Sequence, residues 1–217
     1  HELRTPLTVL KGQNELVLSK PRDPKEYQEV IASNLEEINY MSKVLEDLFI
    51  LSKSDENQIH LNCKPMELRD LVEEVCKHAE VLASDKNIRI IIAFLESVKI
   101  NGDEVRLRQM VWNILDNGIK YTRPGGELKV SLQDEGEFAL LSIQDTGIGI
   151  PEKDLPSIFD RFYRVDKARS RDEGGSGLGL SICKHIAEAH KGKIEVESKL
   201  DVGTRFKIRI PTLSAVG

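Results

Sequence analysis

Residues 138–151 read FALLSIQDTGIGIP, a predicted strand that leads directly into a glycine turn. The stretch from Phe138 to Gln144 is mostly apolar and alternates with polar side chains from Leu141 onward, which is typical of a strand with one buried face. Asp145 ends the strand, and Gly147 and Gly149 follow it. Glycines allow the backbone to approach a flat ligand, and the Asp145 carboxylate can accept a hydrogen bond from an exocyclic amine. A plain glycine turn also fits this motif, so the motif alone indicates a ligand site only weakly.

A second glycine-rich stretch, GGSGLGL at residues 174–180, opens a helix that we predict from Leu178 to His190. Successive backbone amides and a helix N-terminus together favour anionic phosphate oxygens. The stretch contains GxGxG, but a dinucleotide-binding motif follows the first strand of a βαβ unit, whereas this one follows a polar, arginine-rich segment. The chain has no GxxxxGK[ST] loop, which excludes a P-loop NTPase.

A third polar cluster lies in the run RQMVWNILDNGIKYT, within a helix predicted from Asp103 to Tyr121. Asn113 and Asn117 are four residues apart, so both amides lie on one face of this helix. Their oxygens can converge on a cation or on a phosphate chain. Asparagines that satisfy neighbouring backbone groups are the alternative explanation for either residue alone.

The rest of the second part of the chain mixes helices with strands. Apolar spacing predicts helices over residues 66–83, 103–121 and 178–190, and strands over residues 88–94, 128–133, 138–144, 193–198 and 204–210. These elements predict an α/β two-layer sandwich with a mixed sheet, with the sheet on one side and the helices on the other.

The first part of the chain predicts a helical hairpin. Apolar residues recur at helical spacing over residues 1–19 and again from Lys25 to Ser54, and the segment from Pro21 to Pro24 breaks the pattern. A hairpin with an apolar stripe left over cannot bury that stripe alone, so we expect a homodimer through a four-helix bundle. A polar stretch at residues 55–58 marks the boundary, which gives domains at 1–57 and 58–217.

Composition excludes several classes of protein. The 217 residues carry a net charge of −5, which makes nucleic acid an unlikely partner. No apolar run approaches the roughly 20 residues of a membrane span, so any membrane attachment would need segments outside this sequence. Cys63, Cys76 and Cys183 lack metal-binding spacing and fit free thiols in a reducing compartment. The chain begins at His1 and is expected to be a piece of a longer protein.

Taken in order, the motifs resemble a known family. The helix with Asn113 and Asn117, then DTGIGIP, FDRFYR at residues 159–164 and GGSGLGLSI, is similar to the ATP-binding domain of sensor histidine kinases. The same ATPase superfamily also includes heat-shock chaperones and mismatch-repair ATPases. The opening HELRTPL resembles the phosphoacceptor motif of the kinases. This resemblance covers essentially the whole chain and implies a two-component protein kinase.

The resemblance implies roles for the first residues. His1 matches the histidine that attacks the γ-phosphate of ATP, and Glu2 matches the acidic neighbour that takes the imidazole proton. Thr5 matches the residue that positions water when the partner regulator is dephosphorylated.

The resemblance also implies a site for ATP and Mg²⁺. Asn117 corresponds to the magnesium ligand with Asn113 beside it, Lys120 to a phosphate contact, and Tyr121 to a cover for the adenine. Asp145 corresponds to the carboxylate that recognises adenine, in a pocket shaped by two glycines. The residues expected around the nucleotide are Asn113, Asn117, Lys120, Tyr121, Asp145, Gly147, Gly149, Phe159, Arg164, Gly175, Gly177, Leu178 and Gly179. Residues 165–176 correspond to a lid.

The implied partners are a response regulator receiver domain and a second copy of the chain, and the implied location is the cytoplasmic part of a membrane-bound sensor. Two alternatives remain at this point. A chaperone-type or repair-type ATPase would hydrolyse ATP without forming a phosphoprotein. A catalytically silent scaffold would bind nucleotide and turn over nothing.

Overall fold

The computed structural model describes residues 2–55, 61–165 and 175–215. The chain forms two compact units, residues 1–55 and residues 56–217, and each is described separately below. None of the helices in the described ranges is long and apolar enough to cross a membrane.

The first unit is a helical hairpin of α1 (Arg4–Leu18) and α2 (Pro24–Asp55). Proline suits the first position of α2 because no intrahelical donor is needed there. The Asp23 side chain accepts a hydrogen bond from the Lys25 amide at 2.8 Å, which caps the same end. Two polar pairs cross the hairpin: Gln13 Nε2 donates to Ser33 Oγ at 3.2 Å, and Asn14 Oδ1 accepts from Asn34 Nδ2 at 3.2 Å.

An apolar stripe runs along α2 and is exposed in a single copy of the chain. Ile31, Leu35, Ile38, Leu45 and Phe49 follow one another at spacings of four, three, seven and four residues. Each of them is between 46% and 60% exposed. The stripe has the spacing of a coiled-coil seam, with Ser42 at the position between Ile38 and Leu45.

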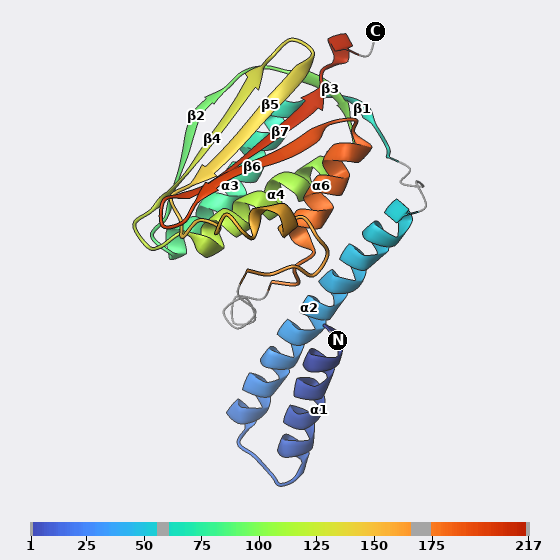
Figure 1. The fold of residues 1–217 in the computed structure, drawn as a ribbon. Coiled ribbons are helices and arrows are strands. Elements are labelled where there is room, and N and C mark those ends of the chain that lie inside the picture. The colour runs from blue at the N-terminus through green and yellow to red at the C-terminus, as the bar shows by residue number, and fades with distance from the viewer. Residues whose placement is uncertain (1, 56–60, 166–174, 216–217) are drawn as a thin grey trace. The chain divides into compact units, whose positions relative to one another are not determined.

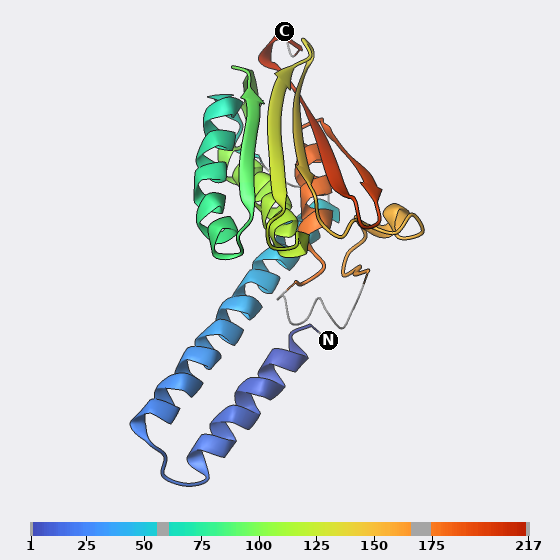
Figure 2. The same ribbon diagram turned by 90° about the vertical axis from the view of Figure 1, so that its left-hand side faces the viewer.

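The second unit has two layers, as Figures 1 and 2 show, with a five-stranded sheet covered on one face by helices. The strand order is β2-β4-β5-β7-β6; β2 pairs parallel with β4 and every other pair is antiparallel, so the sheet is mixed. The strands are β2 (Arg89–Leu95), β4 (Glu127–Asp134), β5 (Phe138–Asp145), β6 (Lys193–Lys199) and β7 (Gly203–Pro211). The helices are α3 (Leu68–Asp85), α4 (Glu104–Tyr121) and α6 (Gly179–Ala189). The predicted two-layer fold is confirmed.

The core forms where the alternating face of the sheet meets these helices. In β5 and β7 every second residue is buried, because successive strand side chains point to opposite faces. Buried aliphatic residues of α4 and α6 pack in the helical layer, among them Leu107, Ile114, Leu115, Ile182 and Ile186. This packing holds α4 under the strand that ends at Asp145.

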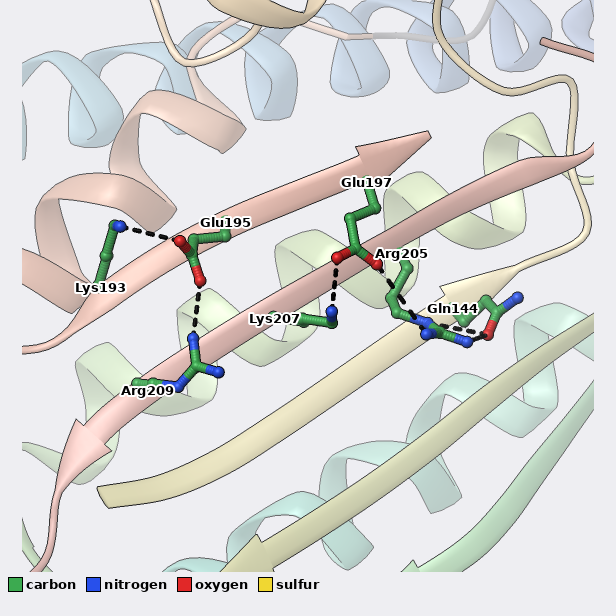
Figure 3. Close-up of polar contacts among 7 residues, drawn as sticks. All are labelled: Gln144, Lys193, Glu195, Glu197, Arg205, Lys207 and Arg209. Atoms are coloured by element: carbon green, nitrogen blue, oxygen red, sulfur yellow. Dashed lines mark hydrogen bonds and ion pairs between the residues drawn. The ribbon is translucent and has the colours of Figure 1, made fainter. Parts of the chain in front are cut away.

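The other face of the sheet is polar, and Figure 3 shows its charged rows. Glu195 on β6 receives hydrogen bonds from Lys193 at 2.8 Å and from Arg209 on β7 at 2.7 Å. Lys207 donates to Glu197, and Arg205 donates to Gln144 of β5. Exposed ion pairs of this kind contribute little to stability. Gln144 lies on this face, so the next residue, Asp145, points toward the helices.

The structure also contains a short sheet that the apolar spacing did not predict. Strand β1 (Lys64–Glu67) pairs antiparallel with β3 (Lys99–Gly102). The helix that we predicted from Met66 therefore begins later, at Leu68. Glu67 ends the strand, and its carboxylate accepts hydrogen bonds from the Val98 amide at 2.7 Å and the Ser97 hydroxyl at 2.8 Å. A four-residue strand is too short to show an alternating pattern.

Candidate nucleotide-binding site

Asp145 is a buried carboxylate at the end of β5. It is 7% exposed, and its Oδ1 accepts hydrogen bonds from the Gly147 amide at 2.8 Å and the Thr204 amide at 3.1 Å. Burial raises the pKa of the Asp145 carboxyl above its ordinary value, and the two amide bonds oppose that shift. Since both bonds reach Oδ1, Oδ2 is the oxygen that can accept a donor from a ligand.

The glycine turn after Asp145 is fixed to the C-terminal end of α4. The Ile148 amide donates to the Tyr121 carbonyl at 3.1 Å. A Cβ on Gly147 would lie 2.5 Å from that same carbonyl oxygen, so no side chain fits there. Gly149 has a φ of +68°, and a Cβ at this position would collide with the Lys199 carbonyl. Both glycines are therefore required by close backbone approach.

Helix α4 carries a polar face beside this turn. Asn113 is buried, at 7% exposed, and its Nδ2 donates to the Gly179 carbonyl of α6 at 3.4 Å. Asn117 lies one turn further along and is half-buried. Lys120 Nζ is 2.6 Å from Asp116 Oδ2, so its ammonium already has a carboxylate partner. A phosphate near Lys120 would share this ammonium with Asp116.

The glycine-rich stretch lies at the start of α6 and contacts the FDRFYR segment. The Phe162 amide donates to the Gly177 carbonyl at 2.9 Å, and both residues have positive φ angles. A Cβ on Gly177 would lie 2.9 Å from the Phe162 backbone. Leu178 has a fully buried side chain, so only its backbone can face a ligand. Gly175 and Gly179 flank this point, and a Cβ on Gly179 would lie 3.8 Å from Asn113.

Two other predicted residues lie in the FDRFYR segment. The Phe159 ring packs edge-to-face on Phe206 of β7, with ring centroids 6.5 Å apart, which makes it part of the packing around the sheet. Arg164 is half-buried. Most of the predicted lid, residues 166–174, lies outside the described residues.

In the hairpin, Glu2 and Thr5 lie at the start of α1. The Tyr40 hydroxyl donates to Glu2 Oε2 at 3.3 Å, which connects the first residues to α2. Thr5 is exposed in the first turn of α1, where a water or a partner can reach it. His1 lies outside the described residues.

The residues present fit a magnesium ion held mainly by a nucleotide. The described parts of the chain contain no group of three His, Cys, Asp or Glu side chains that could hold a metal. Mg²⁺ keeps several waters and takes one or two protein ligands together with phosphates. The Asn117 amide oxygen suits this role, because it lies on the polar face of α4.

Three predicted motifs thus meet: the turn after Asp145, the C-terminal half of α4 and the start of α6. Sequence reasoning missed two contributors. Thr204 supports Asp145 from a strand 59 positions away, for which no local pattern exists. Asp116 is four residues before Lys120, a spacing that could have revealed the pair. The arrangement offers a buried acceptor for an amine and backbone amides for phosphates.

Comparison with known proteins finds a matching family for each of the two units. Residues 102–214 match the family "Histidine kinase-, DNA gyrase B-, and HSP90-like ATPase", and residues 1–57 match the "His Kinase A (phospho-acceptor) domain". The first match covers more than half of the chain and includes α4, the turn after Asp145 and α6.

Among similar proteins, sensor histidine kinase CusS of Escherichia coli K12 is 39% identical over 211 residues, which are 97% of this chain and 44% of that protein. Signal transduction histidine-protein kinase ArlS of Staphylococcus epidermidis is 35% identical over 99% of this chain and 47% of its own length. The chain therefore spans about half the length of these relatives.

Two solved histidine kinase structures have a similar fold. Acinetobacter baumannii histidine kinase AdeS matches with a TM-score of 0.80 and 27% identity, over 98% of each chain. Histidine kinase ThkA, in a complex with the response regulator protein TrrA, matches with a TM-score of 0.73 and 25% identity, over 99% of this chain and 60% of that chain.

Proposed function

The chain belongs to the sensor histidine kinases, and on that premise we propose that it phosphorylates itself on His1 with ATP and passes the phosphoryl group to an aspartate of a response regulator. The observation that carries this proposal is the buried Asp145 carboxylate, held next to the polar face of α4 by the bond from Ile148 to Tyr121. A nucleotide fits this arrangement, because its adenine amine needs a hydrogen-bond acceptor and its phosphates need hydrogen-bond donors.

In this proposal, Asp145 Oδ2 accepts from the adenine amine, and Gly147 and Gly149 let the backbone lie close to the ring. The amides at the start of α6, at Gly177 and Gly179, face the phosphates. Bound magnesium, with Asn117 as its protein ligand, would neutralise charge on the transferring group. Lys120 and Arg164 add positive charge, and Tyr121 covers the adenine.

The phosphoryl transfer itself belongs to the hairpin. An imidazole nitrogen of His1 attacks the γ-phosphorus, a P–N bond forms, and the bond from phosphorus to the ADP oxygen breaks. Glu2 takes the proton from the other ring nitrogen, which makes the attacking nitrogen more nucleophilic. The Tyr40 hydroxyl positions Glu2 for this task. In a separate hydrolytic reaction, Thr5 orients a water that attacks the phosphoryl group on the regulator's aspartate, which frees the carboxylate and releases inorganic phosphate.

The active form in this proposal is a homodimer. The exposed stripe from Ile31 to Phe49 on α2 would be buried against a second copy, which completes a four-helix bundle. The regulator is the second partner, and it would dock on the exposed part of the hairpin after His1. The complex of ThkA with TrrA supports this class of partner.

We place the chain in the cytoplasm, where ATP is available and the three cysteines stay reduced. Attachment to a membrane would come from segments outside these 217 residues. The relatives are roughly twice as long as the chain, which leaves room for a sensor region.

Incubation with γ-labelled ATP and Mg²⁺ tests the proposal. We expect label on the protein that survives alkali and is lost in acid, as phosphohistidine is, and that is absent from His1→Gln. A version extended at its N-terminus controls for a His1 that is poorly placed at the chain end. Phosphate release without labelled protein in both versions would instead support an ATPase, and nucleotide binding without any turnover would support a scaffold.

A further inference from the structure

A buried polar contact joins the two helices that carry the nucleotide motifs, far from those motifs. The Asp103 amide, at the start of α4, donates to Nε2 of His190 at 3.0 Å, at the end of α6. Both residues are buried, at 9% and 7% exposed. His190 Nδ1 lies 2.8 Å from the Ile186 carbonyl oxygen. This bonding assigns the hydrogen to Nδ1 and leaves Nε2 as an acceptor, so His190 is neutral here.

The Asp103 side chain holds a third segment. Its Oδ1 accepts from the Arg106 amide at 3.2 Å and caps α4, and its Oδ2 accepts from the Asn62 amide at 2.9 Å. Asn62 follows the connection between the two units of the chain. A single aspartate therefore holds the Asn62 amide to the start of α4, and through its own amide contacts the end of α6.

The same two helices are joined at two further points. Cys183 Sγ donates to the Met110 carbonyl at 3.6 Å, and Asn113 donates to the Gly179 carbonyl at 3.4 Å. As residue numbers rise along α4 they fall along α6, so the helices are antiparallel and lie side by side in Figure 1. Ten residues of helix separate the contact at Asp103 from the one at Asn113, a distance of about 15 Å.

We propose that Asp103 and His190 form a joint that ties the backbone at Asn62 to the α4 and α6 pair, so that nucleotide bound at one end of the pair restrains Asn62 at the other. Both residues are positioning residues and touch no substrate. The expected effect of nucleotide on Asn62 rests on the proposed function, whereas the contacts that form the joint do not.

The physical reason is that the contacts are directional and buried. Without an acceptor at position 190, the Asp103 amide loses its buried partner, a state that costs more than the bond contributes. Asp103 then has one fewer constraint on its position, and the Asn62 bond loosens. A bound nucleotide that spans Asn117 and Gly177 would order α4 against α6, and this would tighten the Asn62 bond rather than loosen it.

Amide hydrogen exchange on the full chain tests the joint without nucleotide. We expect exchange at Asn62 to rise about tenfold in Asp103→Asn, whose amide oxygen can serve only one of the two partners, and in His190→Leu. His190→Gln offers an oxygen in place of Nε2 and should restore protection. His78→Gln, on the exposed face of α3, is the matched control and should leave Asn62 unchanged.

The nucleotide arm adds Mg²⁺ and a non-hydrolysable ATP analogue, with binding measured separately by calorimetry. In the unmodified chain we expect slower exchange at Asn62, an effect that His190→Leu loses and His190→Gln keeps. Bound nucleotide with no change at Asn62 would overturn the coupling. If nucleotide does not bind, the ATP site is wrong, and the joint is still decided by the nucleotide-free comparison. Should His190→Leu fail to fold, Asp103→Ala removes the acceptors of both the Asn62 and the Arg106 amides, and unchanged exchange at Asn62 in that variant refutes the joint.

Discussion

Replacement of Asp145 by asparagine separates recognition of the nucleotide from folding. The asparagine oxygen can keep both bonds that Oδ1 accepts, from Gly147 at 2.8 Å and from Thr204 at 3.1 Å, because a carbonyl oxygen has two lone pairs. The NH₂ group then occupies the place of Oδ2 and meets the adenine amine, donor against donor. Loss of a hydrogen bond to a charged acceptor costs about 1.5–3 kcal/mol, or about 10- to 100-fold in Kd for ATP.

Stability should move little or rise, since the substitution removes a buried charge whose pKa is already raised by burial. Calorimetric titration with Mg²⁺ and ATP, followed by thermal unfolding, gives both quantities. Asp134→Asn is the matched control: Asp134 accepts from the Gly136 amide at 2.8 Å with the same spacing, but it lies at an exposed turn. Unchanged ATP affinity in a folded Asp145→Asn variant would refute the role assigned to Oδ2.

Four other features give further expectations. Gly149→Ala should lower the free energy of unfolding by about 2–4 kcal/mol in urea titrations, because its Cβ meets the rigid Lys199 carbonyl at a positive φ. Gly12→Ala should raise stability by about 1 kcal/mol, since no atom lies within 4 Å of the added Cβ in mid-helix; an unchanged melting temperature would contradict this. Ile38→Glu should weaken self-association about a hundredfold or more in sedimentation experiments, and a persistent dimer would show that the α2 stripe is not the interface. Burial lowers the pKa of His190, so this side chain binds a proton more tightly in the unfolded chain than in the folded chain. The stability that His190 contributes is therefore present above about pH 6.5 and is lost as pH falls through the folded pKa. His190→Gln should make the melting temperature less dependent on pH over this range in a series of melting curves.

Local patterns predicted most of the second unit. The β4 strand alternates strictly, β5 alternates from Leu141 onward, and the helices α4 and α6 have long apolar faces, so their positions were found to within a few residues. The glycines were also recoverable, because a glycine beside a strand end signals close backbone approach. The order of the motifs then identified the family.

Contacts between distant segments were not predictable in the same way. The Thr204 amide reaches Asp145 only because β7 pairs with β5 in one particular register. Nothing around His190 indicates that its ring accepts from Asp103, 87 positions earlier. The edge-to-face contact of Phe159 with Phe206, 47 positions later, likewise has no local signal in the sequence. Such contacts depend on tertiary packing, which local sequence does not specify.

The parallel pairing of β2 with β4 has a consequence for how the chain reaches its fold. Parallel neighbours need a crossover, and here residues 96–126 provide it, with α4 inside. The pair can align only after this long segment has closed, an entropic cost that slows the assembly of non-local strands. Helix α4 is thus both the carrier of the asparagines and the connection that brings the edge strand to the sheet. Substitutions in the buried face of α4 are therefore expected to slow folding as well as to disturb the site.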